Sequence, residues 1–402
     1  AAALEALAEQ AHTVLRGFNA QDVASTAWAY ATLGVRSTAL MQALAGQAVR
    51  PAVLSSFKVQ ELAMVLWAFA SLEEADGMLM SAAAERLVEG RLLSRGRPQD
   101  VANVAWAYAR LGVVHPPLLQ DLITRLEQEA FLEQCGPQDL SNIAWALSKL
   151  GGLSEELLDL MATRALQDPG LVEFNAQEIS NLMWAFGTLG VRHIPLLSAI
   201  GDHMSSPGVL DTFGSQAMAN TVWAFAKVGV RHEPMMAALA EYLVAHGDVK
   251  LESFIAQEVS NLAWAFARLK FHHDPLLLAI ERRVLQPKFL SSFKPEELAN
   301  LCRAFGNLRV EAGELMRAVA QHLLVDDLLV LLNAHELGLV VRAFGALQVH
   351  DAELVEAVHS RLNDAEFKGT FTEADWANVE YGLQWLAQEE ARDEEESWEP
   401  AW

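Results

Sequence analysis

The chain has 402 residues, a formal net charge of −23 and a hydrophobic content of 52%. This apolar content excludes disorder over most of the length. No window of about 18 uninterrupted apolar residues is present, so we predict no membrane insertion. The acidic balance argues mildly against a nucleic-acid binder, which is expected to carry a basic patch, although net charge does not fix local charge.

The beginning of the chain, residues 1–17, is predicted to be the second helix of a truncated preceding repeat. The sequence also starts without Met. We therefore expect that an earlier repeat or a targeting peptide has been removed or is not represented.

A unit of 39 residues recurs from residue 18 onward. Six tryptophans follow one another at this interval, a seventh comes 41 residues later, and the register continues with other side chains: Trp28, Trp67, Trp106, Trp145, Trp184, Trp223, Trp264, Arg303, Arg342 and Tyr381. A period of about 20–50 residues is the signature of stacked structural repeats. The sequence therefore predicts about ten repeats.

Each unit is predicted to hold two helices. In the unit of Trp184, apolar side chains at Ile179, Leu182, Phe186 and Leu189 follow helical spacing. Several first helices close with Gly, a signal for a helix end, and a second helix usually starts after Pro or an acidic residue. Because neither helix can bury its apolar face alone, the fold class is all-α, an α-solenoid (superhelix) of about ten helix-turn-helix repeats.

The repeats are expected to differ along the chain. Residues 18–310 are predicted to be well-formed helical repeats and residues 311–387 degenerate capping repeats. Residues 388–402 are an acidic tail, which we expect to be disordered unless it is bound to a partner.

The repeated pattern Phe-x-x-Gln-Asp/Glu-Leu-x-Asn-x-x-Trp-Ala-Phe-Ala-x-Leu-Gly resembles the octotricopeptide repeat. It is also similar to the helical repeats of FAST-kinase-like and RAP-domain proteins. The best copies are Gln99–Gly112, Gln138–Gly151 and Gln177–Gly190. The resemblance implies RNA binding in the mitochondrial matrix or the chloroplast stroma, in RNA processing, stability or translation, or as a ribosome-associated subunit. No RAP-like domain follows the repeats.

The candidates for RNA contact are side chains that vary between repeats, because identical positions cannot encode a base sequence. They stand four residues after and nine residues before the tryptophan, and both sets are rich in groups that bind phosphates or base edges. The first set is Arg110, Lys149, Thr188, Lys227, Arg268 and Asn307, and the second is Lys58, Arg97, Asn175 and Lys294.

Two weaker sets have competing interpretations. Asparagines recur three residues before the tryptophan and either form a structural hydrogen-bond ladder, which we favour, or contact bases: Asn103, Asn142, Asn181, Asn220, Asn261 and Asn300. Arg192 and Arg231 lie between the helices and either form a basic stripe or complement helix dipoles. The tryptophans and the aromatic residues two positions later are expected to be core.

No catalytic motif is present: there is no Gly-rich phosphate loop, no His-Glu-x-x-His and no nucleophile elbow. Cys135 and Cys302 are predicted to be reduced core thiols. We therefore predict a protein that is not an enzyme and has no cofactor, metal site or small-molecule substrate.

Two functions stay open. The first is an organellar RNA-binding repeat protein, with RNA and other protein subunits as partners, and the second is a protein–protein scaffold in a large organellar complex. A basic groove free of acids would favour RNA. Crowding of that groove by Asp22, Asp100, Asp139 and their equivalents would favour the scaffold.

Overall fold

The computed structural model describes residues 14–167, 170–325 and 328–396, and within these ranges every regular element is a helix or a 3-10 turn. The chain divides into two compact units, unit 1 with residues 1–199 and unit 2 with residues 200–402. The helix expected for residues 1–17 lies mainly outside the described residues, which begin with the short turn η1 (Leu15–Gly17).

Within each unit, the first helix of every repeat packs on the first helices of its neighbours. This holds for each successive pair within unit 1 and within unit 2. In unit 1 these helices are α2 (Ala20–Thr32), α5 (Val59–Ser71), α7 (Pro98–Leu111), α10 (Pro137–Leu150) and α12 (Ala176–Leu189). In unit 2 they are α14 (Ser215–Val228), α17 (Ala256–Arg268), α19 (Pro295–Leu308), α21 (Ala334–Leu347) and α24 (Glu373–Glu396).

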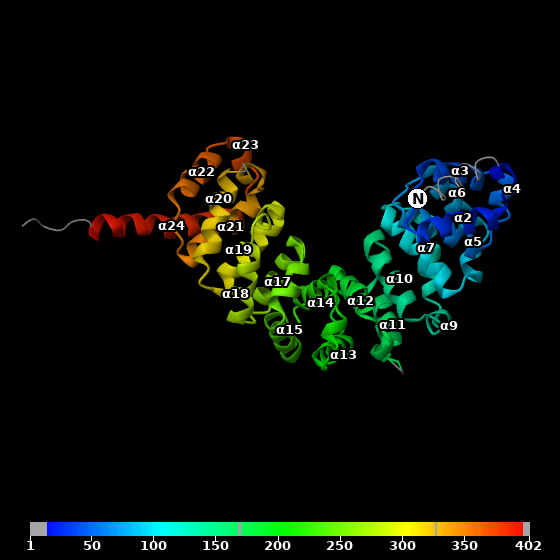
Figure 1. The fold of residues 1–402 in the computed structure, drawn as a ribbon, viewed down its shortest axis with the longest axis horizontal. Helices are drawn as coiled ribbons and strands as arrows, with labels where there is room; N and C mark the ends of the chain where they lie inside the picture. Colours follow the sequence, from blue (N-terminus) through cyan, green and yellow to red (C-terminus); the bar gives the residue numbers. More distant parts are fainter. Residues whose placement is uncertain (1–13, 168–169, 326–327, 397–402) are drawn as a thin grey trace, which may run out of the picture. The chain divides into compact units, whose positions relative to one another are not determined.

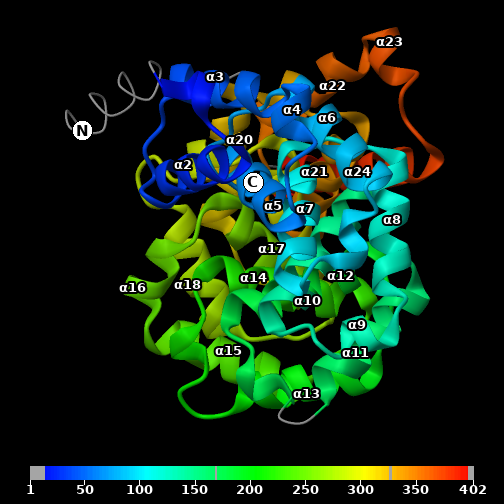
Figure 2. The same ribbon diagram turned by 90° about the vertical axis from the view of Figure 1, so that its right-hand side faces the viewer.

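The second helices form another layer in each unit (Figure 1). They are α3 (Thr38–Ala48), α6 (Gly77–Glu89), α8 (Pro116–Leu126), α11 (Glu155–Leu166), α13 (Ile194–Ser205), α15 (Glu233–Ala245), α18 (Asp274–Val284), α20 (Gly313–Val325) and α22 (Ala352–Leu362). Figure 2 shows α3 and α6 side by side, next to α2 and α5. The predicted all-helical solenoid of stacked helix pairs is confirmed.

A short turn precedes most first helices and was not predicted. These turns are α4 (Pro51–Leu54), η2 (Leu92–Arg95), α9 (Glu129–Leu132), η3 (Gly170–Glu173), η4 (Leu210–Thr212), α16 (Gly247–Lys250), η5 (Leu251–Ser253), η6 (Leu290–Ser292), η7 (Leu328–Leu331) and α23 (Ala365–Lys368). In the repeat of Trp106, for example, the second helix α8 ends at Leu126 and the short helix α9 follows it.

Arginines on the second helices clamp these turns. Arg86 donates to the carbonyls of Ser55 and Phe57 (2.8 and 3.4 Å), and Arg283 donates to those of Leu251, Glu252 and Phe254 (2.9 to 3.3 Å). Arg125 and Arg361 make equivalent bonds. Two of these arginines, Arg86 and Arg125, are themselves 39 residues apart. Aligning the second helices on that register would have found them.

The core lies between the two layers. The residue two positions after the tryptophan is fully buried in the eight copies from α5 to α21. It is aromatic in seven of them, for example Phe186, Phe225 and Phe266, and is Leu147 in α10. Cys135 and Cys302 are also buried and unpaired, and burial raises the pKa of each thiol to about 12. Both thiols are therefore protonated and inert at neutral pH, as expected of core residues.

The end of the array keeps the repeat architecture. Although the sequence template decays from Arg303 onward, α19, α21 and α24 stack like the earlier first helices. Glycines lie at the contacts between these helices: Gly306 of α19 faces Ala343 of α21, and Gly345 of α21 faces Gly382 of α24. The tail was expected to be disordered without a partner, but α24 continues through Glu396. Residues 397–402 lie outside the described residues.

Candidate nucleic-acid interface

Four positions on each first helix share one surface. They stand seven and three residues before the tryptophan, at the tryptophan, and four residues after it, a spacing that places them above one another on a helix. In α12 they are Gln177, Asn181, Trp184 and Thr188, of which the outer two are exposed and the inner two half-buried. We call this surface the tryptophan face, and each unit has its own.

The tryptophans lie on the surface rather than in the core. Trp28 is 45% exposed, and the six that follow are half-buried. We predicted that both the tryptophan and the aromatic residue two positions later are core residues, but only the latter is buried in the core. The expectation for tryptophan was wrong because a first helix is covered on three sides, by two neighbours and the second layer. Its apolar stripe is then so broad that the tryptophan lies at its edge.

Basic side chains lie over the tryptophan rings. The Lys149 ammonium is 5.2 Å from the centre of the Trp184 ring, which belongs to the next repeat, and Lys227 lies 5.8 Å from Trp223. Both distances are within the range of cation–π attraction. The face therefore alternates aromatic surface with positive charge.

The asparagines do not form a backbone hydrogen-bond ladder. Asn181 accepts one bond, from the Gln177 amide at 2.8 Å. The side chains of the other five, all within the described residues, make no hydrogen bond in the structure although these residues are half-buried: Asn103, Asn142, Asn220, Asn261 and Asn300. The structural interpretation that we favoured thus loses its physical basis. Their amides are available to a ligand.

The acids at the start of the first helices serve as caps. In nine of the ten first helices, the carboxylate at the third helical position accepts the backbone N–H of the residue before the helix, as Asp22, Asp100 and Asp139 do at 3.1 Å. Burial raises the pKa of Asp139, although the bond from Gly136 opposes this. These carboxylates lie about 60° or more around the helix from the tryptophan face. They do not crowd it.

The charge of the tryptophan face is positive. Its four positions contain six cations, Arg110, Lys149, Lys227, Arg268, Arg303 and Arg342, against one carboxylate, Glu296. One cation is partly neutralised, because Arg110 pairs with Glu73 at 2.7 Å. The net charge of −23 therefore does not describe this surface.

The candidates nine residues before the tryptophan precede the first helices. The Asn175 side chain accepts the Glu178 N–H at 3.0 Å as a helix cap, and Arg97 pairs with Asp100 at 3.0 Å, which raises the pKa of Arg97. Lys58 and Lys294 are exposed. This set therefore lies apart from the tryptophan face, and two of its members have structural partners.

One family matches the sequence. The family model for the RNA-editing substrate-binding complex 6 protein matches residues 2–116 and again residues 116–250, which together exceed half of the chain. The chain belongs to the RNA-editing substrate-binding complex 6 (RESC6) protein family. Each match spans about three repeats. No curated protein matches the chain, and the octotricopeptide likeness stays a prediction.

The loop residues of this RESC6-family chain contact neighbouring repeats. Arg231 donates to the carbonyls of Leu269 and Lys270 (3.4 and 3.0 Å) and pairs with Glu233, so its role is structural. Arg192 is exposed. The adjacent histidines begin the second helices: the His232 Nδ1 atom accepts the Met235 N–H at 3.2 Å. They cap helix starts and do not complement helix ends.

The described part of the RESC6-family chain holds no helix long and apolar enough to cross a membrane. Likewise, no three His, Cys, Asp or Glu side chains among the described residues come together as a metal site.

Substituting Asn175 by Ala should lower the free energy of unfolding by about 1 kcal/mol, the usual loss for a helix cap, and leave RNA affinity unchanged. Urea denaturation and an RNA titration would measure the two effects. Asn175→Asp keeps the cap and serves as the control. A loss of RNA affinity in Asn175→Ala at full stability would restore Asn175 as a contact residue.

Proposed function

We propose that this protein is a non-catalytic RNA-binding subunit of an RNA-editing substrate-binding complex in an organelle, and that the tryptophan face holds single-stranded RNA. The observation that carries the proposal is that half-buried tryptophan rings alternate with cations on the tryptophan face of each unit, with Lys149 in unit 1 and Lys227 and Arg268 in unit 2. The family name favours an RNA-editing complex over a ribosome. The mitochondrial or chloroplast location rests on the repeat resemblance.

This chemistry suits a single strand. Unstacked bases can lie against aromatic side chains, a contact worth about 1–3 kcal/mol per base, while cations follow the phosphates. The unengaged amides between them, such as Asn220 and Asn261, can bind base edges. Other helical-repeat proteins read about one base per repeat. Unit 1 and unit 2 each contain five first helices, so each of them would hold about five nucleotides.

A protein–protein scaffold is the second candidate, and the charge distribution favours it for the other layer. The second helices carry exposed acids such as Glu155, Asp159, Asp202 and Glu241. They would face away from bound RNA and offer a surface to basic partner subunits. The two functions are compatible, because they use different helix layers within each unit.

A salt series with matched variants tests the RNA proposal. The chain is titrated with a random 12-nucleotide RNA pool between 50 and 300 mM salt, next to the triple variant Lys149→Ala, Lys227→Ala and Arg268→Ala. Each lost phosphate contact reduces the slope of log affinity against log salt by about 0.7. The triple variant should therefore bind more weakly, with a slope smaller by about 2.

The control removes three exposed arginines outside the tryptophan face: Arg50→Ala, Arg282→Ala and Arg317→Ala. It changes the net charge equally, so it should lose little affinity. If both triple variants lost the same RNA affinity, the binding would be non-specific electrostatic attraction and not a site on the tryptophan face. No binding by the wild-type chain at 50 mM salt would end the RNA proposal and leave the scaffold.

A further inference from the structure

A pocket opens in unit 2 where the tryptophan register changes to arginine. It lies between α19 and α21, reaches α24, and has a volume of about 160 Å³. Its lining includes Arg303 and Arg342, at the tryptophan position of two successive repeats, together with Arg309, Asn307 and Tyr381. These arginines are therefore neighbours because the 39-residue register stacks them.

No carboxylate neutralises this pocket. Within the described residues, Arg303, Arg309 and Arg342 form no ion pair, and no acid lines the pocket. Arg303 is half-buried. Burial and the positive charges of Arg268 and Arg342 lower its pKa. Gathering like charges at a partly desolvated site costs free energy, and an anion would recover it.

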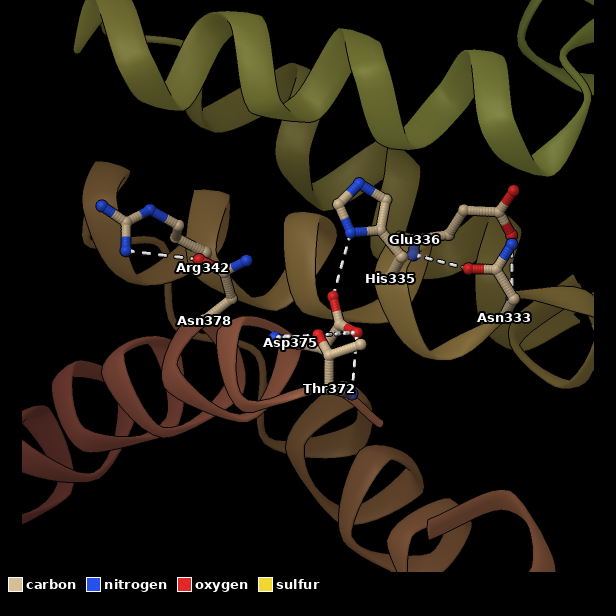
Figure 3. A network of polar contacts seen from close by, with 7 residues as sticks. All are labelled: Asn333, His335, Glu336, Arg342, Thr372, Asp375 and Asn378. Atoms are coloured by element: carbon tan, nitrogen blue, oxygen red, sulfur yellow. Dashed lines mark hydrogen bonds and ion pairs between the residues drawn. The ribbon is translucent and has the colours of Figure 1, made fainter. Parts of the chain in front are cut away.

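Neighbouring side chains hold the pocket in shape. Arg342 donates to the Asn378 side chain at 3.4 Å, and its guanidinium lies 4.7 Å from the centre of the Tyr381 ring (Figure 3 shows the bond to Asn378). Arg309 has a positive φ of 50° at the position where five earlier repeats have glycine. Gly306 forms part of the wall, and a Cβ there would lie 3.0 Å from the Ala343 Cα.

We propose that this pocket is an anion site that binds one phosphate group through Arg303, Arg309 and Arg342. Guanidinium groups match the geometry of phosphate oxygens. The volume is below the range of about 300–1,000 Å³ of drug-sized ligand sites, so the pocket takes a single small group and not a whole nucleotide. The proposal deepens the RNA function, because RNA offers this group either at a chain end or within the backbone.

Three probes distinguish the sources: inorganic phosphate, a six-nucleotide RNA with a 5′-phosphate, and the same RNA with a 5′-hydroxyl. The variant is Arg303→Gln with Arg342→Gln, and the control is Arg282→Gln with Arg317→Gln, which removes two exposed arginines outside the tryptophan face. Millimolar phosphate should raise the melting temperature of the wild type and of the control by several degrees. The double variant should show no such rise.

With RNA, a tenfold preference for the 5′-phosphate that the double variant loses would assign a terminal phosphate. Equal binding of both RNAs, weakened at least tenfold in the double variant, would assign a backbone phosphate. The same phosphate-induced rise in the wild type and the double variant, with unchanged RNA affinity, would overturn the proposal. Since phosphate is tested without RNA, failure of RNA binding alone leaves the site itself supported.

Discussion

Gly382→Ala should destabilise unit 2 by about 1–3 kcal/mol or more, the usual cost of overpacking a core. Gly382 is buried in α24, and a Cβ there would lie 2.3 Å from the Val341 carbonyl oxygen of α21. Because the clashing atom belongs to the backbone, no side-chain rotation can relieve it. The two helices must separate, and the contact between Gly345 and Gly382 is lost with them.

The control for this prediction is Gly46→Ala. Gly46 also lies in a helix, α3, but a Cβ there meets nothing within 4 Å. Alanine should therefore stabilise the chain by about 0.5–1 kcal/mol, because glycine is the poorer helix former. Chemical denaturation of both variants measures the difference. If Gly382→Ala were as stable as the wild type, α24 would not pack on α21 as described.

Phe266→Ala should mainly reduce stability and Trp264→Ala should mainly reduce RNA affinity, although the two residues are only two positions apart in α17. Phe266 is fully buried and contacts Phe271 edge-on at 5.6 Å between ring centres. Its truncation should cost about 3–5 kcal/mol of stability. Trp264 is half-buried, so its truncation should cost markedly less.

RNA affinity should respond in the reverse order. Losing one stacking platform costs about 1–3 kcal/mol, so Trp264→Ala should weaken RNA binding about five- to more than a hundredfold. Phe266→Ala should change affinity little in the fraction that stays folded. Urea denaturation and fluorescence titration give the two values. If Trp264→Ala destabilised the chain as much as Phe266→Ala did, the tryptophan column would be core after all.

The sequence predicted the repeat, its two helices and their boundaries near Gly112, Gly151 and Gly190, which adopt positive φ as helix-ending glycines do. These features follow from local chemistry that every copy repeats. The exposure of Trp184 could not be predicted in the same way. Periodicity identifies an apolar stripe, but the width of the buried surface depends on how many neighbours cover the helix.

The candidate site was predicted in part. Lys149 and Lys227 lie on the surface that the spacing indicated, because the position follows from one helix alone. The partners of Asn175, Arg97 and Arg110 were not foreseen. The contacts of Asn175 and Arg97 depend on the residue at which the helix begins, which the structure defines. The pairing of Arg110 with Glu73 depends on the contact between two repeats.

The polar contacts of Figure 3 join the last two first helices that the structure describes, α21 and α24. Asp375 is buried at the start of α24, where it accepts bonds from Thr372 and lies 2.9 Å from His335. Burial raises the pKa of Asp375, but the bonds from Thr372 and His335 outweigh it and lower the pKa overall. Its carboxylate therefore stays ionised and links the last two first helices.

The arginine clamps have a consequence for folding. Arg283 joins the second helix α18 to the turn that enters α17, so opening one connection releases groups in two successive repeats. In a linear array, stability is a sum over units and over the coupling between nearest neighbours. Unfolding a repeat in the middle of a unit is costly, because its interfaces with both neighbouring repeats are lost. Unfolding a repeat at the end of a unit loses only one such interface. Hydrogen exchange should therefore spread inward from the terminal repeats of each unit.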